Sequence, residues 1–155
     1  MTPPEAGTDS DAGSGSCSAP SDSAPTIAAT CNASAAQSSA GGSIADGIYF
    51  ATADVVLADP TCSSTYVPST TLQIANGVFA FSYAAAGLGG ENQQWSYALS
   101  GLQVTLTLLC DTDPLGTVGA VVTPGYTATE TQLTLFFPSC CADSYTGENV
   151  TFARQ

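Results

Sequence analysis

The stretch TTLQIANGVFAFSY, residues 70–83, carries the clearest structural signal in this chain. Apolar residues alternate with polar or small ones on both sides of Asn76-Gly77, and a period of two places alternate side chains on one face of a β-strand. Asn-Gly is the favoured central pair of a two-residue hairpin, because both residues tolerate positive φ. The stretch therefore predicts two antiparallel strands, 70–74 and 79–83, joined by a tight turn.

The same alternation recurs along the rest of the chain. In YFATADVVL, residues 49–57, the odd-numbered residues are expected to share an inward apolar face, whereas Thr52 and Asp54 point away. No segment of ten or more residues shows helical periodicity, so we predict an all-β protein. Counting the alternating runs predicts eight strands, at 49–57, 70–74, 79–83, 95–99, 104–108, 126–128, 133–137 and 149–153.

Short loops and hairpins join these strands in sequence, so an up-and-down order is the simplest topology. Eight short antiparallel strands, each with one apolar face, can close into a small barrel, which also removes exposed sheet edges. The predicted fold class is therefore an eight-stranded antiparallel up-and-down barrel. A seven- or eight-stranded β-sandwich is the alternative, because the same alternation permits it.

The first part of the chain has a different composition. Gly, Ser, Ala, Thr, Pro and Asp dominate residues 1–43, which hold too little apolar surface to offset the entropy of ordering. We expect a disordered linker over 1–43 and a folded domain over 44–155. The linker resembles the tethers that follow the lipidated cysteine of bacterial outer-membrane lipoproteins. Because Cys17 lacks the apolar run of a lipidation signal, the resemblance implies that any lipid anchor lies upstream of Met1.

The order of segments also resembles the small calycin-type or lipocalin-like β-barrels of bacterial envelope proteins. Three stretches carry the resemblance, IADGIY at 44–49, YALSGLQVTL at 97–106 and YTATETQLTL at 126–135. It covers residues 44–155 and implies the barrel fold. The chain departs from true lipocalins in having no basic residue placed to stack on a tryptophan and no helix after the last strand. Lipocalin function is therefore not carried over.

The ionic inventory excludes most active-site chemistry. The chain has thirteen Asp and Glu, one arginine (Arg154), no lysine and no histidine, for a net charge of −12. Without histidine there is no imidazole base and no histidine-ligated metal. Phosphate and nucleic-acid sites usually use several lysines or arginines, and this chain has one arginine. We therefore expect a non-enzymatic protein that binds neither nucleic acid nor anionic membranes. No apolar run approaches the roughly 18 residues of a transmembrane segment.

Six cysteines in a small chain without histidine indicate disulfides made in an oxidising compartment. Because residues 1–7 hold no export signal, we expect a mature extracellular, outer-membrane or periplasmic protein whose signal was removed. An up-and-down order places four cysteines at one end of the barrel, here called the rim: Cys62, Cys110, Cys140 and Cys141. We expect Cys62 and Cys110 to pair with the vicinal Cys140-Cys141, and Cys17 to pair with Cys31. A vicinal Cys140–Cys141 redox disulfide is the alternative, and spacing alone leaves the connectivity open.

The same rim collects carboxylates. Asp111 and Asp113 share one side of a loop, and oxygen-only ligands suit calcium. The candidate ligands of a calcium site are Asp59, Asp111, Asp113 and Asp143. A solvated acidic loop cluster is the alternative, since the spaced Asp/Asn series and the terminal Glu of an EF-hand are missing.

Aromatic residues fall mostly on the faces assigned inward, where they can fill the barrel core. Small residues on the same faces, such as Ala51 and Ala128, leave room for a cavity that takes an apolar ligand. The candidate cavity residues are Tyr49, Phe81, Trp95, Tyr97 and Tyr126.

The function predicted from the sequence is a non-enzymatic, secreted or envelope-tethered β-barrel that works as a binding or structural module. Three alternatives stay open. One is a carrier of a small apolar ligand of the calycin kind, another is a calcium-dependent adhesion domain, and the third is a hydrolase that works with carboxylates alone. The expected partner is accordingly a protein or a small ligand, and no cofactor other than calcium is expected.

Overall fold

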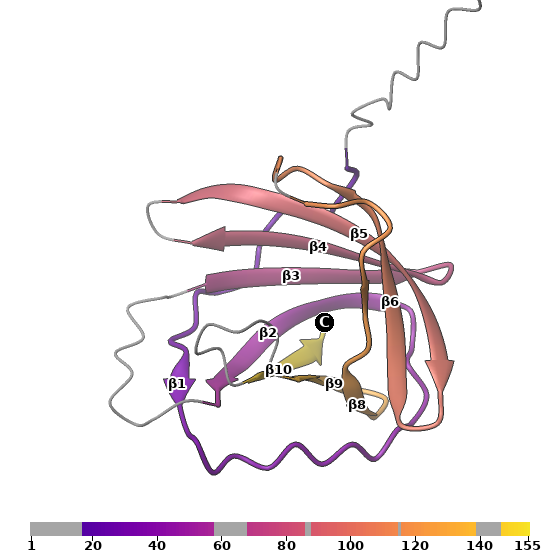
Figure 1. Cartoon of the computed structure of the whole chain (residues 1–155). Helices are drawn as coiled ribbons and strands as arrows, with labels where there is room; N and C mark the ends of the chain where they lie inside the picture. Colours follow the sequence, from indigo (N-terminus) through magenta and orange to yellow (C-terminus); the bar gives the residue numbers. More distant parts are fainter. Residues whose placement is uncertain (1–16, 58–67, 86–87, 115, 139–146) are drawn as a thin grey trace, which may run out of the picture.

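The computed structural model describes residues 17–57, 68–85, 88–114, 116–138 and 147–155. Within these residues the protein has ten strands and no helix (Figure 1). The all-β prediction is thus confirmed. The strands are β1 (Thr30–Cys31), β2 (Gly47–Val56), β3 (Pro68–Ala75), β4 (Val78–Ala85), β5 (Leu88–Ser100), β6 (Gln103–Asp111), β7 (Val121–Val122), β8 (Gly125–Ala128), β9 (Gln132–Pro138) and β10 (Gly147–Arg154).

The strands belong to one mixed sheet whose hydrogen-bonded pairings return to their starting point. Antiparallel pairing runs from β2 through β3, β4, β5, β6, β8, β9 and β10 and back to β2. We call these strands the ring. Its narrowest link is the pairing of β6 with β8, through Gln103 and Gly125, and β7 adds a second short pairing to β6. Parallel pairing of β1 with β2 makes the sheet mixed.

Each of the eight runs predicted from alternation overlaps one strand of the ring, in the predicted order. The 70–83 stretch forms the β3–β4 hairpin, in which Ala75 is paired with Val78. Asn76 and Gly77 have φ values of 53° and 76°, the left-handed region that a two-residue hairpin requires. The hairpin prediction is therefore confirmed. The two-residue strands β1 and β7 were not predicted, because two residues show no periodicity.

Apolar side chains of the ring strands form one buried core. Leu72, Ile74, Phe79, Val104 and Leu135 are each at most 1% exposed. They come from alternate positions of β3, β4, β6 and β9, so the inward faces of strands far apart in sequence meet in the interior. Removing such apolar area from water is the main force that stabilises the closed arrangement.

Residues 17–43, here called the N-terminal segment, differ from the flexible linker that their composition predicts. They lie against the ring, and their hydrogen bonds offset the shortage of apolar contacts. The Asp22 carboxylate accepts hydrogen bonds from the hydroxyls of Ser69 and Thr71 on the outer face of β3. The backbone amides of Ser23 and Ala24 donate to the Thr71 hydroxyl at 3.1 and 3.2 Å.

The N-terminal segment also lies at two places where the ring is weakly paired. β2 pairs with β3 only over Gly47–Phe50, and farther along β2 the strand β1 pairs instead with Val55 and Val56. Near the short β6–β8 link, the backbone of Gly41 exchanges hydrogen bonds with Tyr126 and Ala128 of β8. The segment therefore supplies backbone partners that the ring strands do not supply to each other.

Candidate functional site

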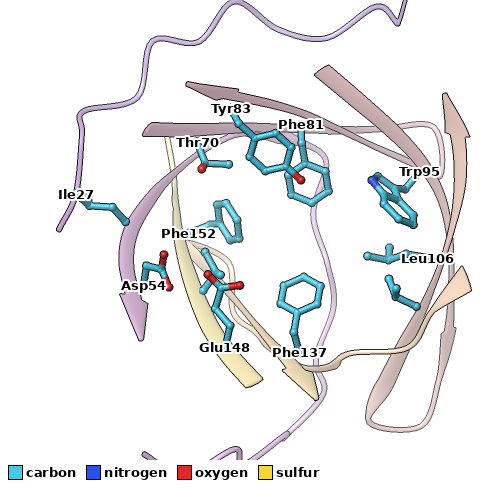
Figure 2. Close-up of a pocket in the computed structure, with 12 residues that line it drawn as sticks. Ile27, Asp54, Thr70, Phe81, Tyr83, Trp95, Leu106, Phe137, Glu148 and Phe152 are labelled. Carbon is cyan, nitrogen blue, oxygen red and sulfur yellow. The ribbon is translucent and has the colours of Figure 1, made fainter. Parts of the chain in front are cut away.

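A cavity of about 350 Å³ lies inside the ring, open at one side (Figure 2). This volume is near the lower end of the range for small-molecule sites. Most of its walls are aromatic or aliphatic, with a polar minority. The lining residues are Ile27, Asp54, Thr70, Phe81, Tyr83, Trp95, Leu106, Val122, Phe137, Glu148, Val150 and Phe152.

The aromatic part of the wall follows from strand alternation. Phe81 and Tyr83 are two residues apart on β4, so both point inward, and their rings stack at 5.8 Å between centroids. Phe152 of β10 faces Phe81 across the interior at 6.3 Å. Figure 2 shows Trp95 on the other side of the cavity and Phe137 below it. A ligand in this space would meet ring faces from three strands or more.

A polar network based on Gln93 lies beside the aromatic wall. The Gln93 side-chain oxygen accepts hydrogen bonds from the Tyr83 hydroxyl (2.9 Å) and the Trp95 indole N–H (3.1 Å). Its amide nitrogen donates to Asp111 Oδ2 at 2.8 Å. The network satisfies the polar atoms of Tyr83 and Trp95 and holds both rings in place, which favours a preformed cavity.

The opposite side of the cavity holds two carboxyl groups, Asp54 of β2 and Glu148 of β10, here called the carboxyl pair (Figure 2). Asp54 is paired with Val150 and Glu148 with Val56, so the two acids are diagonal neighbours across adjacent strands. The side chain of Asp54 is 5% exposed, and its Oδ1 atom has no hydrogen-bond partner. Burial, a hydrogen bond with Glu148 and the charge of Glu148 together raise the pKa of Asp54 to about 7.

The prediction that Asp54 points away from the core was wrong, and a β-bulge explains why. On β10 the consecutive residues Thr151 and Phe152 oppose Ala53 and Ala51 of β2, so Thr52 is an extra residue. The bulge shifts the alternation by one position: Ala51 is buried, Thr52 and Ala53 are exposed, and Asp54 is buried. A bulge re-aims the side chains that follow it, and here it directs a carboxyl group into an apolar cavity.

Of the five predicted cavity residues, some line the cavity and others lie elsewhere in the structure. Phe81 and Trp95 line the cavity. Tyr49 and Tyr126 are instead part of the buried core, where their hydroxyls donate to the carbonyls of Ala45 (2.7 Å) and Gly42 (3.1 Å). Tyr97 packs on Phe79, with 4.7 Å between ring centroids. The carboxyl pair was missed because alternation across a bulge cannot be read from the sequence.

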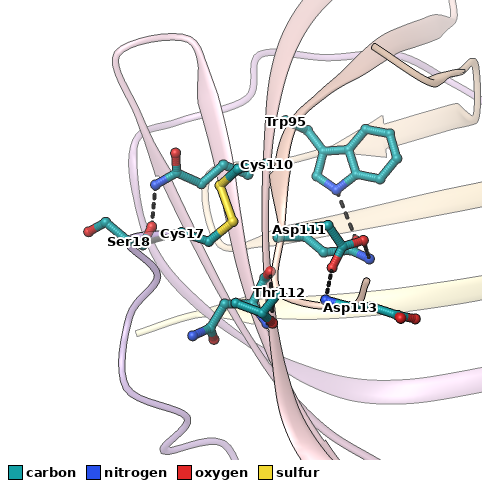
Figure 3. The surroundings of a disulfide bond; sticks show 10 residues. Cys17, Ser18, Trp95, Cys110, Asp111, Thr112 and Asp113 are labelled. Atoms are coloured by element: carbon teal, nitrogen blue, oxygen red, sulfur yellow. Dashed lines mark hydrogen bonds between the residues drawn. A yellow bond between two sulfur atoms is a disulfide. The ribbon is translucent and has the colours of Figure 1, made fainter. Parts of the chain in front are cut away.

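One disulfide joins Cys17 to Cys110, with 5.7 Å between Cα atoms (Figure 3). The predicted pairings of Cys17 with Cys31 and of Cys110 with the vicinal cysteines are therefore wrong. A second irregularity explains the position of Cys110: Gln94 is paired with Cys110 and Trp95 with Leu108, so Leu109 is an extra residue of β6. Cys31 is also disulfide-bonded. Cys62, Cys140 and Cys141 lie outside the described residues, so the pairing predicted for Cys62 stays a prediction.

The candidate calcium ligands are only partly described. Asp111 is the last residue of β6, and the Asp113 amide, two residues later, donates to Asp111 Oδ1 at 2.8 Å. Asp59 and Asp143 lie outside the described residues. In the part of the chain that the structure describes, no three metal-binding side chains gather. The calcium site stays a prediction.

Comparisons of the chain with protein families, with curated proteins and with solved structures found no match. Among the described residues, none forms a helix of the length and hydropathy needed to cross a membrane.

Proposed function

We propose that this protein is a non-enzymatic binding module, secreted or tethered to a cell envelope, whose ring is an eight-stranded up-and-down barrel of the calycin kind. The sequential antiparallel pairings support this topology, since each ring strand neighbours the next along the chain. The Cys17–Cys110 disulfide supports an oxidising compartment. The lack of lysine and histidine supports a role in binding rather than catalysis. Substrate turnover by the purified protein without added metal would contradict this role.

We further propose that the module carries a small apolar ligand inside the ring. The observation that carries this proposal is the aromatic cavity of about 350 Å³, which a fully packed core would not contain. Trp95 is the only tryptophan of the chain and lines the cavity, so its emission reports directly on occupancy.

The test is titration of the protein with N-phenyl-1-naphthylamine, a neutral dye whose absorption overlaps tryptophan emission. We expect saturable quenching of Trp95 and enhanced dye emission. Val150→Phe, which adds volume to the cavity wall, is expected to weaken dye binding at least fivefold. The matched control is Val121→Phe, at a position 57% exposed on β7, which is expected to leave binding unchanged. Absence of saturable binding in the wild-type protein would contradict the carrier proposal.

A further inference from the structure

The carboxyl pair is the one charged feature among the described residues that line the cavity. Its surroundings include Ile27, Phe152 and Val150, and Figure 2 shows the Asp54 and Glu148 carboxyl groups facing each other beside Phe152. Burying a carboxylate among apolar groups carries a large desolvation cost unless it is paired. Asp54 Oδ1 is buried and lacks a partner. Protonation of Asp54 avoids the cost below about pH 7, and the cost appears when the carboxyl group ionises.

No lysine, arginine or histidine of the chain is placed to offset the desolvation cost of an ionised carboxyl pair. Arg154 is the only such residue in the sequence, and it lies six residues from Glu148 along β10, about 20 Å away at the rise of a strand. Its guanidinium donates to the Asp46 carbonyl at 2.7 Å, at the other end of β10. When the carboxyl pair is ionised, no lysine, arginine or histidine of the chain supplies a positive charge beside it, and a bound molecule can supply one.

We infer that the ligand of this cavity is a small amphiphile with one protonated amine, whose ammonium group binds Asp54 and Glu148 while its apolar body lies among the aromatic rings. This inference rests on the proposed carrier function and names its ligand class. An ammonium group donates up to three hydrogen bonds, which matches the unpartnered Asp54 Oδ1 and the neighbouring Glu148. Charge-assisted hydrogen bonds of this type are about twice as strong as neutral ones.

The surroundings favour an organic cation over a metal ion. Calcium takes six to eight oxygen ligands, and among the described residues only the carboxyl pair and the Thr70 hydroxyl supply side-chain oxygens on this side of the cavity. Phe81 and Phe152 offer ring faces instead, and such faces attract organic cations and pack against apolar chains. The net charge of −12 also raises the local concentration of a cationic ligand.

The experiment compares two probes of one shape, 4-phenylbutylamine and 4-phenylbutan-1-ol, by calorimetry and by Trp95 emission excited at 295 nm. The amine stays protonated at pH 8, since primary amines of this type titrate near pH 10. We expect the amine to bind at least tenfold more tightly than the alcohol at pH 8. At pH 5 we expect that preference to fall at least threefold, because protonation removes charge from the carboxyl pair.

Two variants test whether the carboxyl pair causes the preference for the amine over the alcohol. Asp54→Asn and Glu148→Gln are each expected to reduce amine affinity at least fivefold and to leave alcohol affinity within twofold, so alcohol binding reports an intact cavity. The matched control is Glu130→Gln, which removes one charge from the exposed β8–β9 turn at the other end of β9 and is expected to preserve the amine preference.

The outcomes separate this inference from the carrier proposal. Equal binding of amine and alcohol to the wild-type protein would overturn the inference and leave the carrier proposal standing. Binding of neither probe would overturn both. Displacement of the amine by millimolar calcium, at constant ionic strength, would overturn the inference in favour of a metal site. An amine preference that survives in Asp54→Asn and Glu148→Gln would place the cation elsewhere and would also overturn it.

Discussion

The Asp54→Asn substitution is expected to stabilise the protein above pH 7 and to have little effect near pH 4. The pKa of Asp54 is raised from its ordinary 3.8 to about 7, so the native state holds a proton that the unfolded chain releases. This raised pKa contributes stability that is fully present below pH 4 and is lost as pH rises through 7. Asparagine keeps the shape of the side chain and does not ionise.

The expected gain in stability follows from the size of the Asp54 pKa shift. About three pH units at 1.36 kcal/mol each correspond to at most about 4 kcal/mol between the two protonation states. Part of this belongs to the Glu148 charge, which Asp54→Asn leaves in place, and the asparagine amide can donate to that carboxylate. We therefore expect the variant to gain on the order of 2 kcal/mol of unfolding free energy over the wild type between pH 4 and pH 8.

Urea unfolding with the disulfides intact measures this gain at pH 4, 5, 6, 7 and 8, followed by Trp95 fluorescence and far-UV circular dichroism. Glu130→Gln is the control, since it removes the same charge from an exposed turn and reports the general relief of repulsion in a chain of net charge −12. Parallel stability curves for wild type and Asp54→Asn over pH 4–8 would refute the reasoning. So would an equal pH-dependent gain in Glu130→Gln.

Two further predictions concern the N-terminal segment. Replacing Cys17 and Cys110 together by serine removes a link between residues 93 apart in sequence. We expect urea unfolding to show a loss of roughly 2–5 kcal/mol of unfolding free energy, because the unfolded chain gains conformational freedom. An unchanged urea midpoint would contradict a stabilising role of this disulfide. At Gly42, with φ of 119°, an added Cβ would lie 2.2 Å from the Ala128 carbonyl oxygen. Gly42→Ala is therefore expected to detach this part of the segment and to speed hydrogen exchange of the Ala128 amide at least tenfold. The control is Gly119→Ala, where the added Cβ would have open space. It is expected to leave exchange of the Ala128 amide within twofold of wild type.

Local physics explains why the strands were predictable. A period of two over five or more residues occurs where one face of a strand is buried, and the Asn76-Gly77 pair specifies a turn through backbone sterics alone. The inward positions of Leu72, Ile74 and Phe79 follow from the same rule. Phe81 and Trp95 follow the same alternation and line the cavity.

The direction of the Asp54 side chain and the partner of Cys17 depended on contacts between residues distant in sequence. Asp54 was placed on the wrong face because a bulge at Thr52 shows only in the pairing of β2 with β10. The Cys17–Cys110 disulfide was missed because the composition of residues 17–43 suggests a free linker, whereas hydrogen bonds to Thr71 and to the β8 backbone hold this segment against the ring. Such bonds are invisible to hydrophobic periodicity.

The amino-acid sequence by itself determines that this protein is all-β, that its strands follow one another in a known order, and that neither a lysine nor a histidine can neutralise its acids. Only the tertiary structure decides which acids need neutralising. Asp54 and Glu148 lie 94 positions apart, and the pairing of β2 with β10 and the bulge in β2 bring their carboxyl groups together beside Phe152. The physical reason is that alternation is a property of each strand, whereas register and bulges are properties of a pair.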